Sequence, residues 1–257
     1  MVFDKNVHMV LAKARLGFCL LSSALILTAC GGGGGDSSTS TTSSASPTLN
    51  LNEAYGSFVK NGSWENGIIT GYCQGTRQLT YSPTYVGTTL NNVAALIANN
   101  SEIDTIPASS SAFCKAFYGF NGSQVAQIYY DPVTILPISS GSSPAGYVYS
   151  NQIPLPTSVT AGSSGTMFTY QDFRGTPSPI TSGVLTWVVT ADTASTLLFT
   201  TTDTSRLTSN GALVYKSITT YRINANNTLL DLYKNIQPTN IATQGEGDQN
   251  VYETYYY

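Results

Sequence analysis

The stretch SITTYRINANNTLLDLYKNI, residues 217–236, contains two β-prone segments on either side of the polar turn Asn224-Ala225-Asn226-Asn227. In the second segment Leu230, Leu232 and Ile236 alternate with Asp231, Tyr233 and Asn235. A period of two is typical of a strand with one face in the core and the other in water. The stretch therefore predicts an antiparallel β-hairpin, and it sets the fold class for the chain around it.

Similar signals recur over residues 49–257, where charged residues are scarce and Thr, Tyr, Val and Ile abound. Between these segments lie four Asn-Gly pairs, at Asn61-Gly62, Asn66-Gly67, Asn121-Gly122 and Asn210-Gly211. They predict hairpin turns, because a type I′ turn needs positive φ at both central positions and Asn-Gly adopts it readily. The predicted strands are Ile68 to Cys73, Arg77 to Tyr81, Phe113 to Phe120, Gln124 to Tyr130, Thr134 to Ile138, Gly146 to Ser150, Met167 to Gln171, Val184 to Ala191, Thr196 to Thr201, Ala212 to Asn224, Leu229 to Ile236 and Val251 to Tyr256. About twelve strands predict an all-β, antiparallel sandwich or barrel-like domain.

One short helix is expected over Leu90 to Ala98, with Thr89 as its N-cap and Asn99-Asn100 as its end. Residues 141–165 are rich in Pro, Ser and Gly and mark either a long connection or a subdivision of the domain. Gly67-Ile68-Ile69-Thr70 is similar to Gly183-Val184-Leu185-Thr186, which leaves open two similar β halves.

The first residues have the layout of an export signal. Lys5, Lys13 and Arg15 precede an apolar run over residues 16–27. That run would reach about 18 Å as a helix, short of the roughly 30 Å of hydrocarbon that a membrane span must cross. The segment is therefore expected to direct export and not to span a membrane permanently.

Leu27-Thr28-Ala29-Cys30 follows this run and resembles the lipobox of bacterial lipoproteins. The resemblance implies that residues 1–29 are a signal peptide, and that Cys30 becomes the first residue and carries the lipid. Lipoproteins of this kind are anchored stably in a membrane, because several acyl chains enter the bilayer. The residue after the cysteine is Gly31 and not Asp. By the same resemblance this implies that the protein is attached to the outer membrane, with its folded domain facing the periplasm or the cell surface. Residues 30–48 are Gly-, Ser- and Thr-rich and predict a disordered tether with a span near 20 to 25 Å.

Composition excludes several classes of function. Removing residues 1–29 takes away three of eleven basic and one of fourteen acidic residues, so the formal charge falls from −3 to −5; nucleic acid is not an expected partner. The single histidine, His8, leaves with the signal. Serine–histidine and cysteine–histidine catalysis and histidine-ligated zinc are thereby excluded. Cys73 and Cys114 remain after Cys19 is removed and Cys30 is lipidated, and in an oxidising envelope they are expected to form a disulfide.

The remaining candidates for chemistry are weak. Ser57-Phe58-Val59-Lys60 fits the S-x-x-K pattern of penicillin-recognising enzymes, but the S-D-N and K-T-G elements are missing, and Gly56 and Asn61-Gly62 should break a helix there. A carboxylate pair for glycoside hydrolysis needs no histidine, yet no spacing identifies one. Five acids lie near expected loops, where solvated surface charge is the simpler interpretation: Glu65, Glu102, Asp104, Asp131 and Asp172. Residues 245–250 are interpreted as a solvated turn and not as a calcium loop.

Aromatic residues leave one further possibility, because rings with polar tips suit sugar faces and protein partners. Trp187 lies within an apolar strand and is expected in the core, whereas Trp64 lies between two Asn-Gly pairs and is expected to be exposed. We therefore expect a lipid-anchored binding or structural module of the cell envelope, without cofactor or metal, whose partner is an envelope glycan or protein. The alternative is an envelope glycan hydrolase that uses a carboxylate pair.

Overall fold

The structure is a computed structural model that describes residues 46–89, 92–110, 114–115, 123–141, 146–173, 176–238 and 251–256. The predicted signal peptide, Cys30 and most of the tether lie outside these residues, as do Asn121-Gly122 and residues 245–250. Of the predicted strand Phe113 to Phe120, only Cys114 and Lys115 are described, and both are helical.

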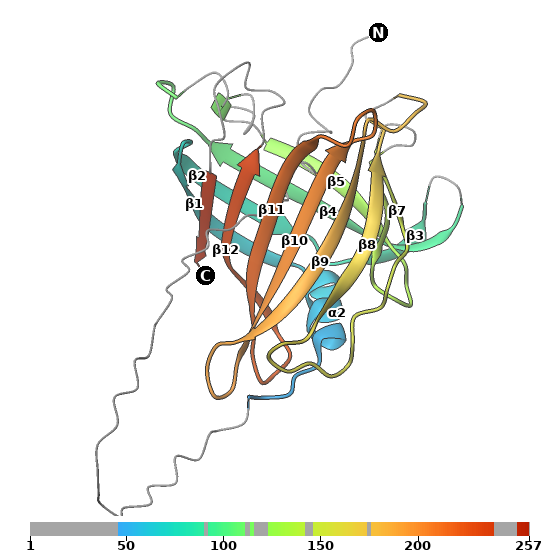
Figure 1. The fold of residues 1–257 in the computed structure, drawn as a ribbon, viewed down its shortest axis with the longest axis vertical. Coiled ribbons are helices and arrows are strands. Elements are labelled where there is room, and N and C mark those ends of the chain that lie inside the picture. The colour runs from blue at the N-terminus through green and yellow to red at the C-terminus, as the bar shows by residue number, and fades with distance from the viewer. Residues whose placement is uncertain are drawn as a thin grey trace, which may run out of the picture.

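In the part of the chain that the structure describes, thirteen antiparallel strands form a single sheet, which confirms the predicted all-β, antiparallel class (Figure 1). In chain order they are β1 (Ser63–Gly71), β2 (Gly75–Tyr81), β3 (Tyr85–Thr88), β4 (Ala94–Thr105), β5 (Ser123–Tyr130), β6 (Pro137–Ser140), β7 (Tyr147–Ser150), β8 (Ser164–Asp172), β9 (Thr181–Ala191), β10 (Leu197–Leu207), β11 (Leu213–Ile223), β12 (Leu229–Pro238) and β13 (Val251–Tyr256). Their order in the sheet is β2-β1-β13-β12-β11-β10-β9-β8-β7-β6-β5-β4-β3. Strands on both sides of residues 141–165 thus belong to one sheet.

β2, at one end of this strand order, is also hydrogen-bonded to β4, which lies next to the other end. β4 pairs with β3 over Ala94 to Ile97 and with β2 over Asn100 to Thr105, so β2 and β3 follow one another along the same edge of β4. Among the described strands, the shortest ladder is the one between β6 and β7, where two residue pairs are in register. Figure 1 shows β8 to β12 as one wall and β1, β2, β4 and β5 behind it.

A helix, α2, spans Leu51–Asn61. The prediction of a helix over Leu90 to Ala98 was wrong, because Ala94 to Ala98 belong to β4. Asn50 is its N-cap and accepts a hydrogen bond from the backbone N–H of Glu53 at 3.0 Å. Gly62, with φ of 71°, is its C-cap, and its N–H donates to the carbonyl oxygen of Phe58. The predicted Asn61-Gly62 hairpin is therefore a helix end. Gly56 does not break the helix, because it lies on the buried face opposite Ile135.

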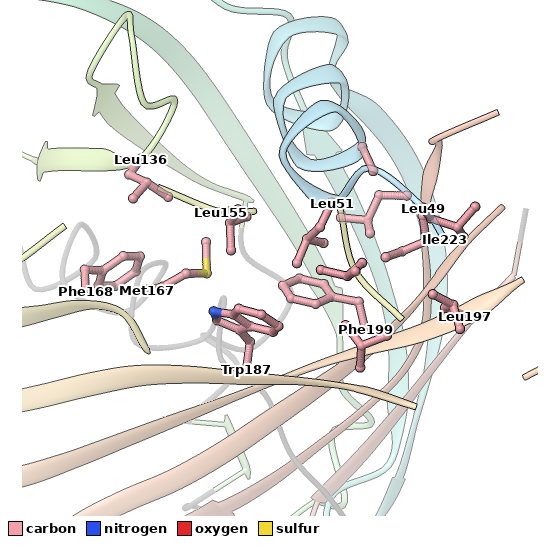
Figure 2. Packing of buried hydrophobic residues seen from close by; sticks show 14 of the residues in the cluster. Leu49, Leu51, Leu136, Leu155, Met167, Phe168, Trp187, Leu197, Phe199 and Ile223 are labelled. Atoms are coloured by element: carbon pink, nitrogen blue, oxygen red, sulfur yellow. The ribbon is translucent and has the colours of Figure 1, made fainter. Parts of the chain in front are cut away.

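The core lies between α2 and the two walls near one end of the sheet (Figures 1 and 2). Leu51 of the helix is fully buried, as are Phe199 and Ile223 on β10 and β11. On the other side of the helix, Val59 packs with Tyr130 of β5. Because the helix contributes to both clusters, it fills the space that a curved sheet would otherwise leave open.

The strand predictions were most accurate where a hairpin joins two long strands. The β11–β12 hairpin turns at residues 224–228 with Asn227 at φ 53°, and Gly211 at φ 72° turns β10 into β11. Asn66-Gly67 was wrongly predicted as a turn and lies inside β1. β3 and β4 were missed.

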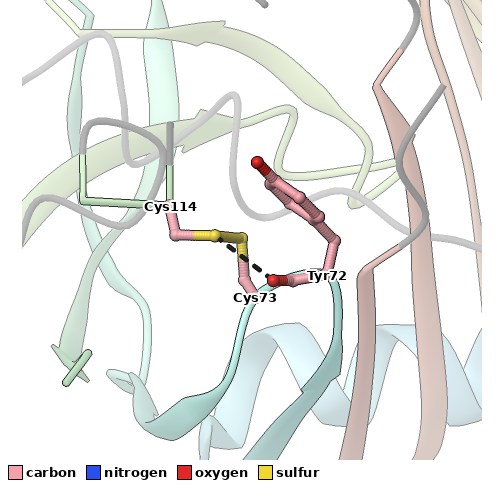
Figure 3. The surroundings of a disulfide bond; sticks show 3 residues. All are labelled: Tyr72, Cys73 and Cys114. Carbon is pink, nitrogen blue, oxygen red and sulfur yellow. Dashed lines mark hydrogen bonds between the residues drawn. A yellow bond between two sulfur atoms is a disulfide. The ribbon is translucent and has the colours of Figure 1, made fainter. Parts of the chain in front are cut away.

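The predicted disulfide is present. Cys73 and Cys114 are bonded with a Cα–Cα distance of 5.5 Å, and both are buried with Ile69 and Ile106. Figure 3 shows the sulfur of Cys114 beside the carbonyl oxygen of Tyr72, at 3.7 Å. The bond ties the end of β1 to a segment far along the chain. Among the residues described, none of the helical segments has the length and apolar character of a membrane span.

Candidate functional site

Strand β1 departs at three positions from the usual placement of apolar side chains inside and polar ones outside. Glu65 is 1% exposed and faces inward with Ile69. Trp64 is 55% exposed and Ile68 is 45% exposed, and both face outward. The prediction that Trp64 is exposed is confirmed, as is the burial of Trp187. Buried polar residues and exposed large apolar ones are the informative exceptions to burial rules, so this strand marks the region to examine.

The register extends the outward row of Trp64 across three further strands. Trp64 pairs with Thr80 of β2, Thr80 with Ser101 of β4, and Ser101 with Val125 of β5. We call the outward residues of these four strands the platform: Trp64, Asn66, Ile68, Thr70, Thr76, Gln78, Thr80, Asn99, Ser101, Ile103, Thr105, Val125 and Gln127. Each of them is exposed or half-buried, and none carries a charge.

Part of the platform is held in a fixed orientation by hydrogen bonds. The side-chain amide of Gln127 donates to Oδ1 of Asn99 at 3.1 Å and to the hydroxyl of Tyr85 at 3.3 Å. Its carbonyl oxygen accepts from the hydroxyl of Tyr129. Tyr85 lies on β3 and is 47% exposed. Side chains from three strands therefore form one surface network with a second exposed ring at its edge.

The prediction that the acids near loops are solvated was wrong for four of the five. Glu65, Glu102, Asp104 and Asp172 are between 0% and 2% exposed, because they lie on the inner faces of β1, β4 and β8. Asp203 of β10 is also buried, and its Oδ1 accepts a hydrogen bond from the Tyr170 hydroxyl at 2.8 Å. The sheet thus encloses carboxylates that the sequence alone placed on its surface.

Arg77 joins two of these buried carboxylates. Its Nη2 donates to Oε1 of Glu102 at 2.7 Å, and its Nε and Nη2 donate to the two oxygens of Asp104 at 2.8 and 3.0 Å. All three side chains are at most 2% exposed. Paired and enclosed carboxylates cannot meet a polymeric substrate, so this cluster holds strands together and does not supply the acid pair of a glycoside hydrolase.

Glu65 and Asp131 differ from that cluster. Oε1 of Glu65 accepts from the Ser63 hydroxyl at 2.8 Å, whereas Oε2 is buried without a hydrogen bond. Asp131 instead caps the turn after β5. The backbone N–H of Thr134 is the main cause of its lowered pKa, and the N–H of Val133 adds to it. Neither arrangement forms a converging pair.

Ser57 and Lys60 do lie on a helix, contrary to the expectation that Gly56 breaks it. The Ser57 hydroxyl accepts a hydrogen bond from the side-chain amide of Asn61 at 3.0 Å, and Lys60 is exposed. The other elements of that enzyme pattern remain missing from the sequence. Within the described ranges, no group of three or more His, Cys, Asp or Glu side chains could hold a metal ion.

Sequence reasoning found Trp64 but missed the rest of the platform. The signal that could have found it is the uncharged outward pattern of β2 and β4, Thr76-x-Gln78-x-Thr80 and Asn99-x-Ser101-x-Ile103. It was hidden because the helix predicted over Leu90 to Ala98, with its end at Asn99-Asn100, prevented recognition of β4, and because the register of β4 with β2 could not be known.

Comparison with known proteins found no matching family model, no similar curated protein and no similar solved structure.

Proposed function

We propose that this protein is a lipid-anchored, non-catalytic binding module of the cell envelope, which binds its partner through the platform. The anchor is supported by the lipobox-like residues Leu27 to Cys30 and by the Gly- and Ser-rich segment that separates them from α2. That segment is long enough to hold a folded domain clear of lipid headgroups. The partner is an envelope glycan or an envelope protein.

The exposure of Trp64 is the observation that carries the binding role. A tryptophan left 55% exposed on a regular strand keeps a large apolar surface in water, which a partner would bury. It lies on a hydrogen-bonded sheet, so little conformational entropy is lost on binding. Tryptophan is also among the residues that most often dominate binding energy.

The burial of the acids supports a role without catalysis. Glu102 and Asp104 are bound to Arg77, and Glu65 and Asp172 are enclosed. A hydrolase would need a pair of accessible carboxylates on opposite sides of the scissile bond. The platform itself contains hydroxyls, amides and apolar groups, which bind but do not transfer protons at neutral pH.

Cosedimentation with insoluble envelope material tests the proposal. The full mature protein, kept in a detergent without a sugar headgroup, should sediment with the envelope fraction, and Trp64→Ala should remain largely in the supernatant. Val188→Ala, on the outer face of β9, is the matched control and should behave as wild type. Wild-type protein that stays in solution, or Trp64→Ala that sediments equally well, would contradict the proposal.

A further inference from the structure

The geometry points to an uncharged glycan chain as the partner of the platform, an inference that rests on the proposed binding function. Charge distinguishes this face from the opposite wall. The outward residues of β10 and β11 include Arg206, Lys216 and Arg222, the last of which is ion-paired with Asp192, whereas none of the platform residues is charged. Nucleic acids and anionic lipid surfaces are bound through clustered Lys and Arg, so the platform fits a neutral partner.

The distribution of apolar residues favours a glycan over a protein. Trp64 and Ile68 on β1 are separated from Ile103 on β4 by β2, whose outward residues Thr76, Gln78 and Thr80 are all polar. Protein interfaces gather their apolar anchors into a desolvated centre with a polar rim. Here each apolar group has polar neighbours in register, which leaves no such centre.

The same interleaving matches the chemistry of a sugar. A pyranose ring has C–H groups on its faces and hydroxyls around its rim, so it needs an apolar plane with donors and acceptors beside it. The Trp64 ring provides the plane, and the hydroxyls of Thr80 and Ser101 lie in the same register row. Hydroxyls and amides can both donate and accept, which suits sugar hydroxyls that do the same.

A second aromatic residue indicates a chain and not a single sugar. Tyr85 pairs with Ile97 of β4. Ser101, four residues further along β4, belongs to the register row that contains Trp64. At about 3.3 Å per residue the two rows are about 13 Å apart. The Asn99 and Gln127 side chains lie between them and are already oriented by mutual hydrogen bonding. Two rings with polar groups between them form an extended site.

The test uses the full mature protein and two carbohydrate fractions of the envelope. Protease-digested envelope polysaccharide is passed over an anion exchanger, so that the flow-through is neutral glycan and the retained fraction is acidic. Binding of each is measured by titration calorimetry. We expect the neutral fraction to bind wild type, with affinity about thirty-fold weaker for Trp64→Ala and roughly five-fold weaker for Thr80→Ala.

Control variants and melting temperatures separate an effect on binding from an effect on folding. Val188→Ala and Thr204→Ala, on the outer faces of β9 and β10, should bind as wild type. Trp64→Phe keeps a ring and should recover part of the affinity, and melting temperatures should match throughout because Trp64 is exposed.

Binding of the acidic fraction alone, or of neither fraction, overturns the glycan inference. If protease treatment of the envelope then abolishes Trp64-dependent cosedimentation, the partner is a protein and the binding function stands. If wild type fails to sediment even with untreated envelope, the proposed function itself fails.

Discussion

Arg77 and Asp104 face each other in register across β2 and β4, with Nε 2.8 Å from Oδ1 and both side chains fully buried. This pair lies in the ladder by which β2, at one end of the strand order, also pairs with β4. Glu102, two residues earlier on β4, accepts from the same guanidinium. The ion pair therefore fixes the register between β2 and β4.

Arg77→Leu should lower the free energy of unfolding by about 3 to 5 kcal/mol, because it leaves two buried carboxylates without this cation. Arg77→Lys should fall between this variant and wild type, since an ammonium keeps the charge but cannot bind Asp104 with two nitrogens. Chemical denaturation monitored by circular dichroism measures both. An Arg77→Leu protein as stable as wild type would show that the pair does not hold this ladder.

Reduction of the disulfide between Cys73 and Cys114 should destabilise the fold by at most about 4 kcal/mol, the loop-closure value for a bridge whose cysteines are 41 residues apart. The expected sign is a lower melting temperature after reduction and alkylation, with envelope binding retained by the folded fraction. An unchanged melting temperature after verified reduction would contradict a structural role. A Cys73→Ala, Cys114→Ala double variant provides the same comparison without reductant.

Stability should fall in alkaline solution because of Tyr55 and Tyr130. Burial is the main cause of the raised pKa of each, and repulsion between neighbouring tyrosines adds to it. The unfolded phenol ionises near pH 10. The contribution of these neutral phenols to the free energy of unfolding is therefore fully present below about pH 10. It is lost as the pH rises toward their higher pKa in the folded protein.

Tyr55→Phe should therefore lose less melting temperature between about pH 9 and pH 11 than wild type. Tyr85→Phe, at an exposed position, is the control and should follow the wild-type curve. Thermal unfolding across this range decides the matter, and identical slopes for wild type and Tyr55→Phe would argue against the buried phenol as the cause.

Mass spectrometry of protein extracted from membranes should find Cys30 as the first residue, carrying diacylglycerol. Cys30→Ser should abolish the modification and release the protein from the membrane fraction, because one residue provides the thioether. Its circular dichroism spectrum should match that of wild type, since the tether after Cys30 has few apolar residues for a core. Recovery of an unmodified Cys30 peptide would exclude a lipid anchor at this position.

The sequence predicted strands whose apolar and polar residues alternate and failed where that alternation is absent. β12 was found from its alternation, and β13 at its observed bounds. β4 was mistaken for a helix because Ala95 and Ile97 are buried on one face while Ala98 is buried on the other. A strand buried on both sides has a continuous apolar run, which periodicity cannot separate from a helix.

The platform was predictable only in part for a related reason. Trp64 could be placed at the surface from its flanking Asn-Gly pairs, but Glu65 could not be placed inside, because an inward carboxylate is expected only when its partner is known. Ser63 supplies one hydrogen bond, and Arg77 neutralises other acids from a neighbouring strand. These partnerships depend on cross-strand register, which the sequence does not specify locally.

The pairing of β13 between β1 and β12 has a consequence for the time course of folding. β1 cannot complete its hydrogen bonds until β13, Val251–Tyr256, about 180 residues further along the chain, has been synthesised and paired. Folding is therefore governed by contacts between distant parts of the chain, which are slow to form. During that interval β1 and β12 present open edges that other chains could pair with, so a nascent molecule is most vulnerable to aggregation immediately before the six residues of β13 are inserted between them.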